Sequence, residues 1–313
     1  MRSLHRNVRR FIALLACSAS WAAADEFADF HCIQAPPYRV VTDESSTEIE
    51  RTIEVLTELR RQFVERFRPL IRDTVVPQDI EVVFFSKEEA FRAYTQRVAP
   101  AFVESAGFFS TGEQRLVLLN QLGSSRYTRL DQQLSRRQRE PRLDRDEPAQ
   151  RHLAAWRTEA TREARAMTER LIRHEGAHQL FHSYQVHSPD GLEPTWLTEG
   201  LAGYCEPATI GQFHHTLAER LARFRDDGAL LPLDELLAHR DPAGFFALAP
   251  QRAEVAYAQS WALVYLLMES DRRADFFRLI ELYRQGDDRG VIGSVELIGS
   301  QLETRWQAFL KRL

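Results

Sequence analysis

The chain contains very little lysine and cysteine. Lys87 and Lys311 are its two lysines, so nearly all of its 41 basic side chains are arginine. Three cysteines are too few for the disulfide framework of a small secreted scaffold. The 45 acidic residues bring the net charge to −4, which does not favour general affinity for nucleic acid. With 313 residues, 44% of them hydrophobic, the composition is that of a globular protein and excludes a disordered chain.

The amino terminus combines arginine with a short apolar run. Four arginines lie within the first ten residues, and an apolar stretch follows over 11–24. This stretch is too short to span a bilayer comfortably, and it ends in an A-x-A signal at Ala24. We therefore expect a signal peptide over 1–24, cleavage after Ala24, no transmembrane helix, and a periplasmic or secreted mature protein. A second interpretation is a lipoprotein signal, with Cys17 as the lipidated residue.

Export changes the interpretation of the other two cysteines. Cys32 and Cys205 can pair in an oxidising compartment, because disulfides persist there. Two unpaired, buried thiols are the alternative, and the sequence leaves both open.

Apolar patterning in the first 122 residues predicts a small mixed sheet with helices packed on it. The strands expected are 38–41, 80–85, and a hairpin of 107–110 with 115–120. Two pairs with capping-box spacing, Ser45 with Glu48 and Ser86 with Glu89, predict helices that end near Pro69 and Arg97.

The pattern then changes twice. The stretch 123–151 has many charged and few apolar residues, which predicts a charged insertion or mobile loop. From 152 to 313 the sequence is mostly helical, with a long helix over 154–184, another opened by Pro194, and an apolar one over 257–268. We expect an α+β fold in which 25–122 form an N-terminal α/β part and 152–313 a helical part.

Two histidines lie one helical turn apart in the segment HEGAH, at His174 and His178. Apolar residues continue the same stripe at intervals of three and four: Met167, Leu171 and Phe181. Imidazoles at i and i+4 can bind one Zn²⁺, and Glu175 then lies beside the metal without ligating it. Two satisfied core histidines beside a surface Glu175 are the alternative.

A catalytic zinc site needs a third protein ligand. Glu199 lies 21 residues after His178, early in the helix opened by Pro194 and among apolar neighbours. An unpaired carboxylate in such surroundings would be costly, whereas zinc would satisfy it. We therefore expect His174, His178 and Glu199 to be the zinc ligands.

The segments HEGAHQL, from His174, and PTWLTEGLAGY, from Pro194, together resemble the gluzincin metallopeptidases. The resemblance is to the peptidase-MA-like domains of uncharacterised bacterial proteins and, more distantly, to the aminopeptidase branch. It implies a zincin-like fold, zinc on the three ligands, and Glu175 as general base. Thr198 stands where that branch usually has asparagine, and no G-x-M-E-N-type motif is present.

Tyr257 opens a segment similar to the Y-x-K-G element of the aminopeptidase branch, whose tyrosine stabilises the oxyanion. The resemblance gives Tyr257 that role, and a buried helix-end tyrosine is the alternative. His182 lies too far along the helix to share an ion with His174. The remaining histidines have no partner spacing and are expected on the surface: His152, His187, His214, His215 and His239.

These observations favour a zinc-dependent hydrolase that cleaves peptide bonds with a zinc-activated water, Glu175 acting as general base. A peptide or protein is the expected substrate, and strand 107–110 is the candidate for holding it by strand addition. The alternatives are a zinc-binding module without turnover and a zinc amidase that acts on a non-peptide substrate of the cell envelope.

Overall fold

The structure is a computed structural model that describes residues 27, 29–140, 146–188, 191, 193–238, 250–286 and 301–313. The expected signal peptide, Cys17 and His239 lie outside these residues. The α+β class expected from the sequence is confirmed, with a mixed sheet near the amino terminus and mostly helices after it. The chain forms two compact units, one of Met1–Leu56 with Pro77–Glu175 and one of Thr57–Val76 with Gly176–Leu313.

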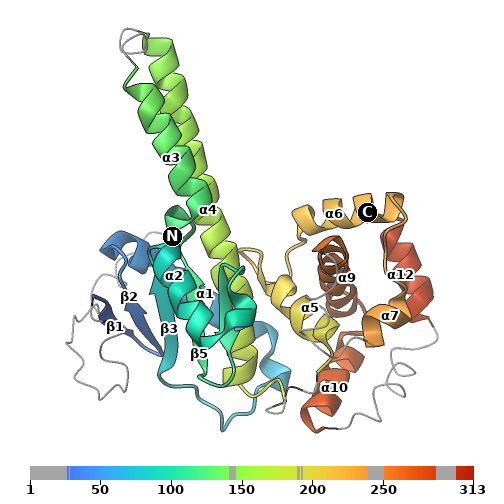
Figure 1. Cartoon of the computed structure of the whole chain (residues 1–313). Helices are drawn as coiled ribbons and strands as arrows, with labels where there is room; N and C mark the ends of the chain where they lie inside the picture. Colours follow the sequence, from blue (N-terminus) through green and yellow to red (C-terminus); the bar gives the residue numbers. More distant parts are fainter. Residues whose placement is uncertain are drawn as a thin grey trace, which may run out of the picture. The chain divides into compact units, whose positions relative to one another are not determined.

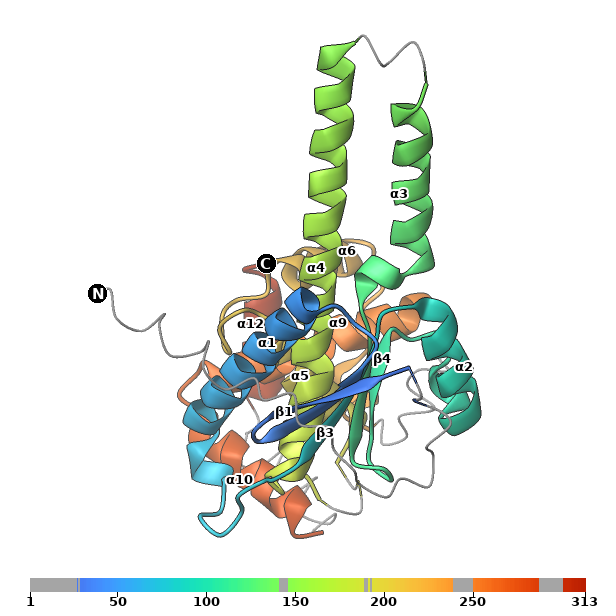
Figure 2. The same cartoon turned by 90° about the vertical axis from the view of Figure 1, so that its left-hand side faces the viewer.

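The first unit is built on a five-stranded sheet of order β1-β2-β3-β5-β4. The strands are β1 (His31–Ala35), β2 (Tyr38–Thr42), β3 (Ile80–Phe85), β4 (Gly107–Ser110) and β5 (Arg115–Leu119). β2, β3 and β5 run parallel to one another, whereas β1 and β4 are antiparallel edge strands (Figure 2). Four of the five strands match the sequence prediction, and β1 is the addition.

Helices α1 (Ser46–Arg66) and α2 (Glu88–Val98) follow β2 and β3 in sequence. Phe91 and Tyr94 of α2 belong to a buried apolar cluster with the strand residues Phe85 and Phe108. The capping box expected at Ser86 is wrong. The N-cap is Lys87, because the Ser86 hydroxyl donates instead to Asp43 at 2.6 Å.

A helical hairpin rises from the same unit, formed by α3 (Ser125–Gln138) and α4 (Glu147–Ser183) (Figure 1). Of the charged insertion or mobile loop expected over 123–151, the loop is wrong over α3, which is helical. Ser124 caps this helix, and polar contacts pair it with α4. Arg157 lies 3.0 Å from Asp131 and donates to the Ser135 hydroxyl at 2.6 Å. Such contacts leave no apolar period in the sequence.

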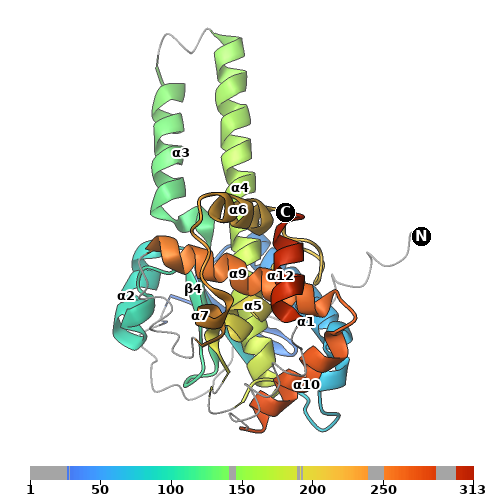
Figure 3. The ribbon, with the colours of Figure 1, turned by 90° about the vertical axis from the view of Figure 1, so that its right-hand side faces the viewer.

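The second unit is helical (Figure 3). Besides the ends of α1 and α4, it contains α5 (Thr195–Cys205), α6 (His215–Asp226), α7 (Leu233–Ala238), α9 (Pro250–Met268), α10 (Arg273–Arg284) and α12 (Leu302–Leu310). Helix α9 is its centre and contacts α5, α6, α7, α10 and α12. Three single-turn 3₁₀ helices complete the described chain: Arg68–Leu70, Pro100–Phe102 and Gln121–Gly123. A search of the described residues found no helix with the length and apolarity needed to cross a membrane.

Candidate metal centre

Helix α4 carries both motif histidines on one side. His174 and His178 are half-buried and lie one turn apart, as the sequence predicts. The division between the two units falls between Glu175 and Gly176, but α4 is continuous across it. One turn further on, the buried Phe181 ring packs against Phe63 with centroids 4.8 Å apart. This apolar contact anchors the helix end just beyond His178.

Glu199 comes from α5, a helix that is buried along nearly its whole length. Glu199 itself is 8% exposed. A Cβ added to the next residue, Gly200, would lie 2.5 Å from the Ser260 carbonyl oxygen of α9. The absence of a side chain at Gly200 therefore allows α5 and α9 to approach closely, and this packing fixes the position of Glu199.

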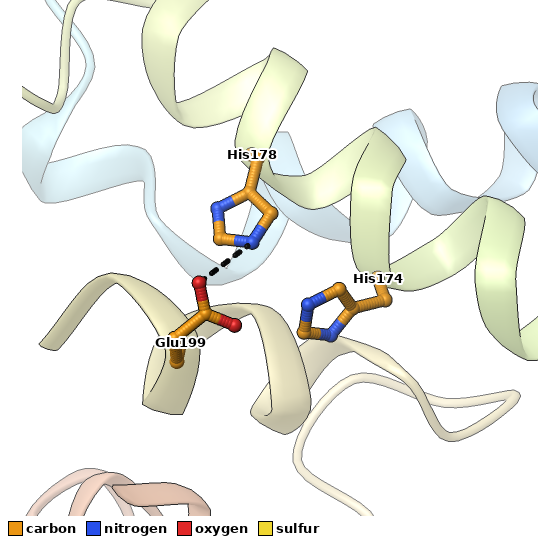
Figure 4. A group of neighbouring side chains, drawn as sticks. All are labelled: His174, His178 and Glu199. Carbon is orange, nitrogen blue, oxygen red and sulfur yellow. Dashed lines mark ion pairs between the residues drawn. The ribbon is translucent and has the colours of Figure 1, made fainter. Parts of the chain in front are cut away.

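The structure brings His174, His178 and Glu199 together (Figure 4). One ligand atom from each residue lies within 4.8 Å of the other two, and His178 Nε2 is 3.6 Å from Glu199 Oε1. Ligand atoms of a tetrahedral zinc ion are about 3.4 Å apart, given metal–ligand distances near 2.0–2.1 Å. The three side chains therefore form a group that can hold a metal ion after small rotations.

The types of ligand atom in this group favour some metal ions over others. Two imidazoles and one carboxylate form one of the ligand sets of catalytic zinc sites, in which a fourth position is left for water or substrate. Hard cations such as Ca²⁺ and Mg²⁺ prefer all-oxygen sites. The residues present therefore fit zinc, and they leave a coordination position open for chemistry.

One family model matches part of the chain. Residues 170–286 match the family described as "Protein of unknown function (DUF1570)". That segment spans less than half of the chain, but it contains the three residues of the candidate metal centre, Glu175 and Tyr257. No curated protein matches the chain.

The two residues expected to take part in catalysis, Glu175 and Tyr257, lie on different helices. Glu175 is half-buried on α4, next to His174 and three residues before His178, so it lies on the flank of the histidine face. Tyr257 lies on α9, and its hydroxyl donates to Glu206 Oε1 at the carboxyl end of α5. Glu206 was not singled out by the sequence, because its partners are remote or lie across a loop.

Two histidines expected on the surface are half-buried instead, which corrects that prediction. The side chains of His187 and His214 are each 10% exposed. His214 Nε2 lies 2.9 Å from Glu206 Oε2, and His187 Nδ1 lies 3.8 Å from Glu193 Oε1. The two residues of each pair belong to the connection between two helices and not to one helix, so helical spacing does not reveal their contact. His152 and His215 are exposed, as expected.

The loop between α4 and α5 holds a buried carboxylate, Glu193. Burial raises its pKa, but the neighbouring His187 imidazole and the Ser188 backbone N–H outweigh this, so its pKa lies below the ordinary value. The pKa of His182 is lowered by burial and by His187. Of the two described cysteines, Cys32 is half-buried and Cys205 is buried.

Proposed function

We propose that the chain is an exported zinc-dependent metallopeptidase of the gluzincin type. The observation that carries this proposal is the convergence of His174, His178 and Glu199 from two helices, with Glu175 on the flank of the histidine pair. A purely structural zinc site would need no base beside its ligands. When bound, the ion supplies a Lewis acid that polarises a carbonyl group and lowers the pKa of water.

Glu175 is the proton carrier of this proposal. Its carboxylate accepts a proton from the attacking water and delivers it to the nitrogen of the leaving amine. A half-buried carboxylate suits this task, because it is accessible to water and held by a rigid helix. Its position one residue after His174 keeps it beside the ion without making it a ligand.

Strand β4 is the proposed binding edge for an extended peptide. It is the last strand of the sheet and pairs with β5 on one side. Gly107 of β4 approaches α4, since a Cβ there would lie 3.2 Å from Leu171 Cδ1, one turn before His174. An edge strand can bind a peptide through its backbone hydrogen bonds.

The test is a peptide-library digest. Purified residues 25–313, loaded with zinc, are incubated with a diverse peptide library and the cleavages are identified by mass spectrometry. Glu175→Gln is the matched control, because it preserves side-chain size while removing the base. Cleavage by the wild-type protein but not by the control supports the proposal and shows whether cleavage is internal or terminal.

Two other outcomes would each contradict a part of the proposal. Zinc bound at one ion per chain without any cleavage would favour a zinc-binding module or a non-peptide amidase. Cleavage of equal rate in Glu175→Gln would remove Glu175 from the reaction.

A further inference from the structure

A half-buried chain of three polar side chains joins α5, α6 and α9 in the second unit. The Tyr257 hydroxyl of α9 donates to Glu206 Oε1, and the other oxygen of Glu206 lies 2.9 Å from His214 Nε2. The Glu206 and His214 side chains are 11% and 10% exposed. Both carboxylate oxygens of Glu206 are thus engaged.

The tautomer of His214 follows from its second contact. The backbone N–H of Leu217 donates to His214 Nδ1 at 3.3 Å, which caps the start of α6. Nδ1 must therefore carry a lone pair, and a neutral His214 has its proton on Nε2, facing Glu206. His214 is accordingly a donor to Glu206, and its own orientation is fixed by the helix that it caps.

The Tyr257 hydroxyl lies over the same side of α5 as Glu199. A Cβ at Gly203 would lie 3.7 Å from the Tyr257 hydroxyl oxygen. Gly203 follows Glu199 by four residues in α5, so the two positions share one face of the helix. A larger side chain at Gly203 would crowd the hydroxyl, so the glycine keeps this space open.

We propose that Glu206, oriented by His214, is a positioning residue that holds the Tyr257 hydroxyl ready for the oxyanion of the hydrolysis. This inference rests on the proposed function. A phenol has one proton, and without substrate Tyr257 donates that proton to Glu206. The O–H turns from Glu206 to the carbonyl oxygen as negative charge develops there. The proton stays on Tyr257, while Glu206 retains the bond from His214.

A double-mutant cycle separates this role from a structural one. Tyr257→Phe removes an oxyanion donor and should lower kcat by about 10²–10³-fold. Glu206→Gln should lower kcat by about tenfold through misplacement of the hydroxyl, with KM changed less than about twofold. In the Tyr257→Phe background, Glu206→Gln should have almost no further effect, because the group that it positions is gone.

A second readout needs neither metal nor substrate. The eight tyrosines are labelled with ¹³C at Cζ, and the Tyr257 signal is identified by its loss in Tyr257→Phe. Glu206→Gln should move this signal. Glu269→Gln is the matched control, because Glu269 accepts a hydrogen bond from Tyr204 elsewhere in the same unit. It should move the Tyr204 signal, leave that of Tyr257 in place, and leave kcat unchanged.

The outcomes are distinguishable. Equal loss of kcat from Glu206→Gln with and without the Tyr257 hydroxyl would overturn the positioning role while peptide hydrolysis stands. An unmoved Tyr257 signal would overturn the hydrogen bond itself. A wild-type protein that hydrolyses no peptide would overturn the proposed function and, with it, the role of the pair in catalysis.

Discussion

Helix α4 has two halves of opposite character. Over 147–163 nearly every side chain is exposed or half-buried, and Trp156 is 61% exposed. From 164 onward, buried residues recur along the helix: Ala164, Thr168, Ile172, Ala177, Leu180 and Phe181. The first half pairs with α3 through polar contacts, whereas the second half carries the two histidines of the candidate metal centre.

The difference shows what holds each half in place. Exposed ion pairs such as Arg157 with Asp131 contribute roughly 0–1 kcal/mol each. Burial of a large apolar side chain such as Phe181 contributes about 1.5–3 kcal/mol. The histidines therefore lie where the helix is most firmly fixed, which is what a site with defined geometry requires. The predictions below test whether function and stability follow this division.

The largest expected effect is at Glu175, in the buried half. Glu175→Gln should lower kcat by at least about 10²-fold, since general-base catalysis typically contributes 10²–10⁴-fold. Its zinc content should equal that of the wild-type protein, because Glu175 is not a ligand. Kinetics and elemental analysis on the same preparations check both statements. Loss of zinc in this variant would show that Glu175 holds the ion.

Gly200→Ala should have the next largest effect. A methyl group there meets the Ser260 carbonyl oxygen at 2.5 Å and Val264 Cγ2 at 2.6 Å, so α5 must move away from α9. We expect a loss of about 1–3 kcal/mol in the free energy of unfolding and weaker zinc binding. Gly112→Ala is the control, because a Cβ there meets nothing within 4 Å. Urea denaturation measures the free energy of unfolding of both variants. Equal stability of Gly200→Ala and Gly112→Ala would contradict the account.

Glu193→Gln tests how the connection between α4 and α5 contributes to stability at different pH values. The pKa of Glu193 in the folded state lies below its ordinary value, so its ionised form stabilises the fold at neutral pH. This contribution is lost as the pH falls through the folded-state pKa. We expect Glu193→Gln to lower the free energy of unfolding by about 1 kcal/mol at pH 7. The difference from the wild-type protein should shrink at pH 3.

Denaturation at both pH values, with exposed Glu254→Gln as control, checks the sign of this effect. A difference from the wild-type protein that grows in acid would show that the Glu193 pKa is raised instead.

The smallest effect is expected in the exposed half. Asp131→Asn removes the ion pair with Arg157 and should change the free energy of unfolding by less than about 1 kcal/mol. Zinc binding and hydrolysis should stay within experimental error of the wild-type values. A large loss of hydrolysis would mean that the hairpin of α3 and α4 takes part in substrate binding.

Sequence patterns predicted the elements that have strong apolar periods. Strand β3, the hairpin of β4 and β5, and the second half of α4 all bury a regular set of apolar side chains. Helix α3 was missed because Leu134 is its single buried residue, and one buried residue produces no apolar period in the sequence. Strand β1 was missed for the same reason, since Ile33 is the single buried residue among its five.

The candidate metal ligands were found from the sequence because their spacing is itself the signal. His174 and His178 are related by one helical turn, and Glu199 lies in a short apolar helix. Glu206 and His214 carry no such signal, since they approach each other only when the loop between α5 and α6 folds back. Contacts across loops depend on tertiary packing, which local spacing does not encode.

The central claim is that His174, His178 and Glu199 bind one zinc ion. Its most direct test is zinc affinity, measured by competition with a chromophoric chelator for the wild-type protein, His178→Ala, Glu199→Gln and the control Glu269→Gln. The account predicts one zinc per chain for the wild-type protein and the control, and at least about tenfold weaker binding for the two ligand variants. Equal affinity in all four proteins, or no zinc binding by the wild-type protein, would contradict it.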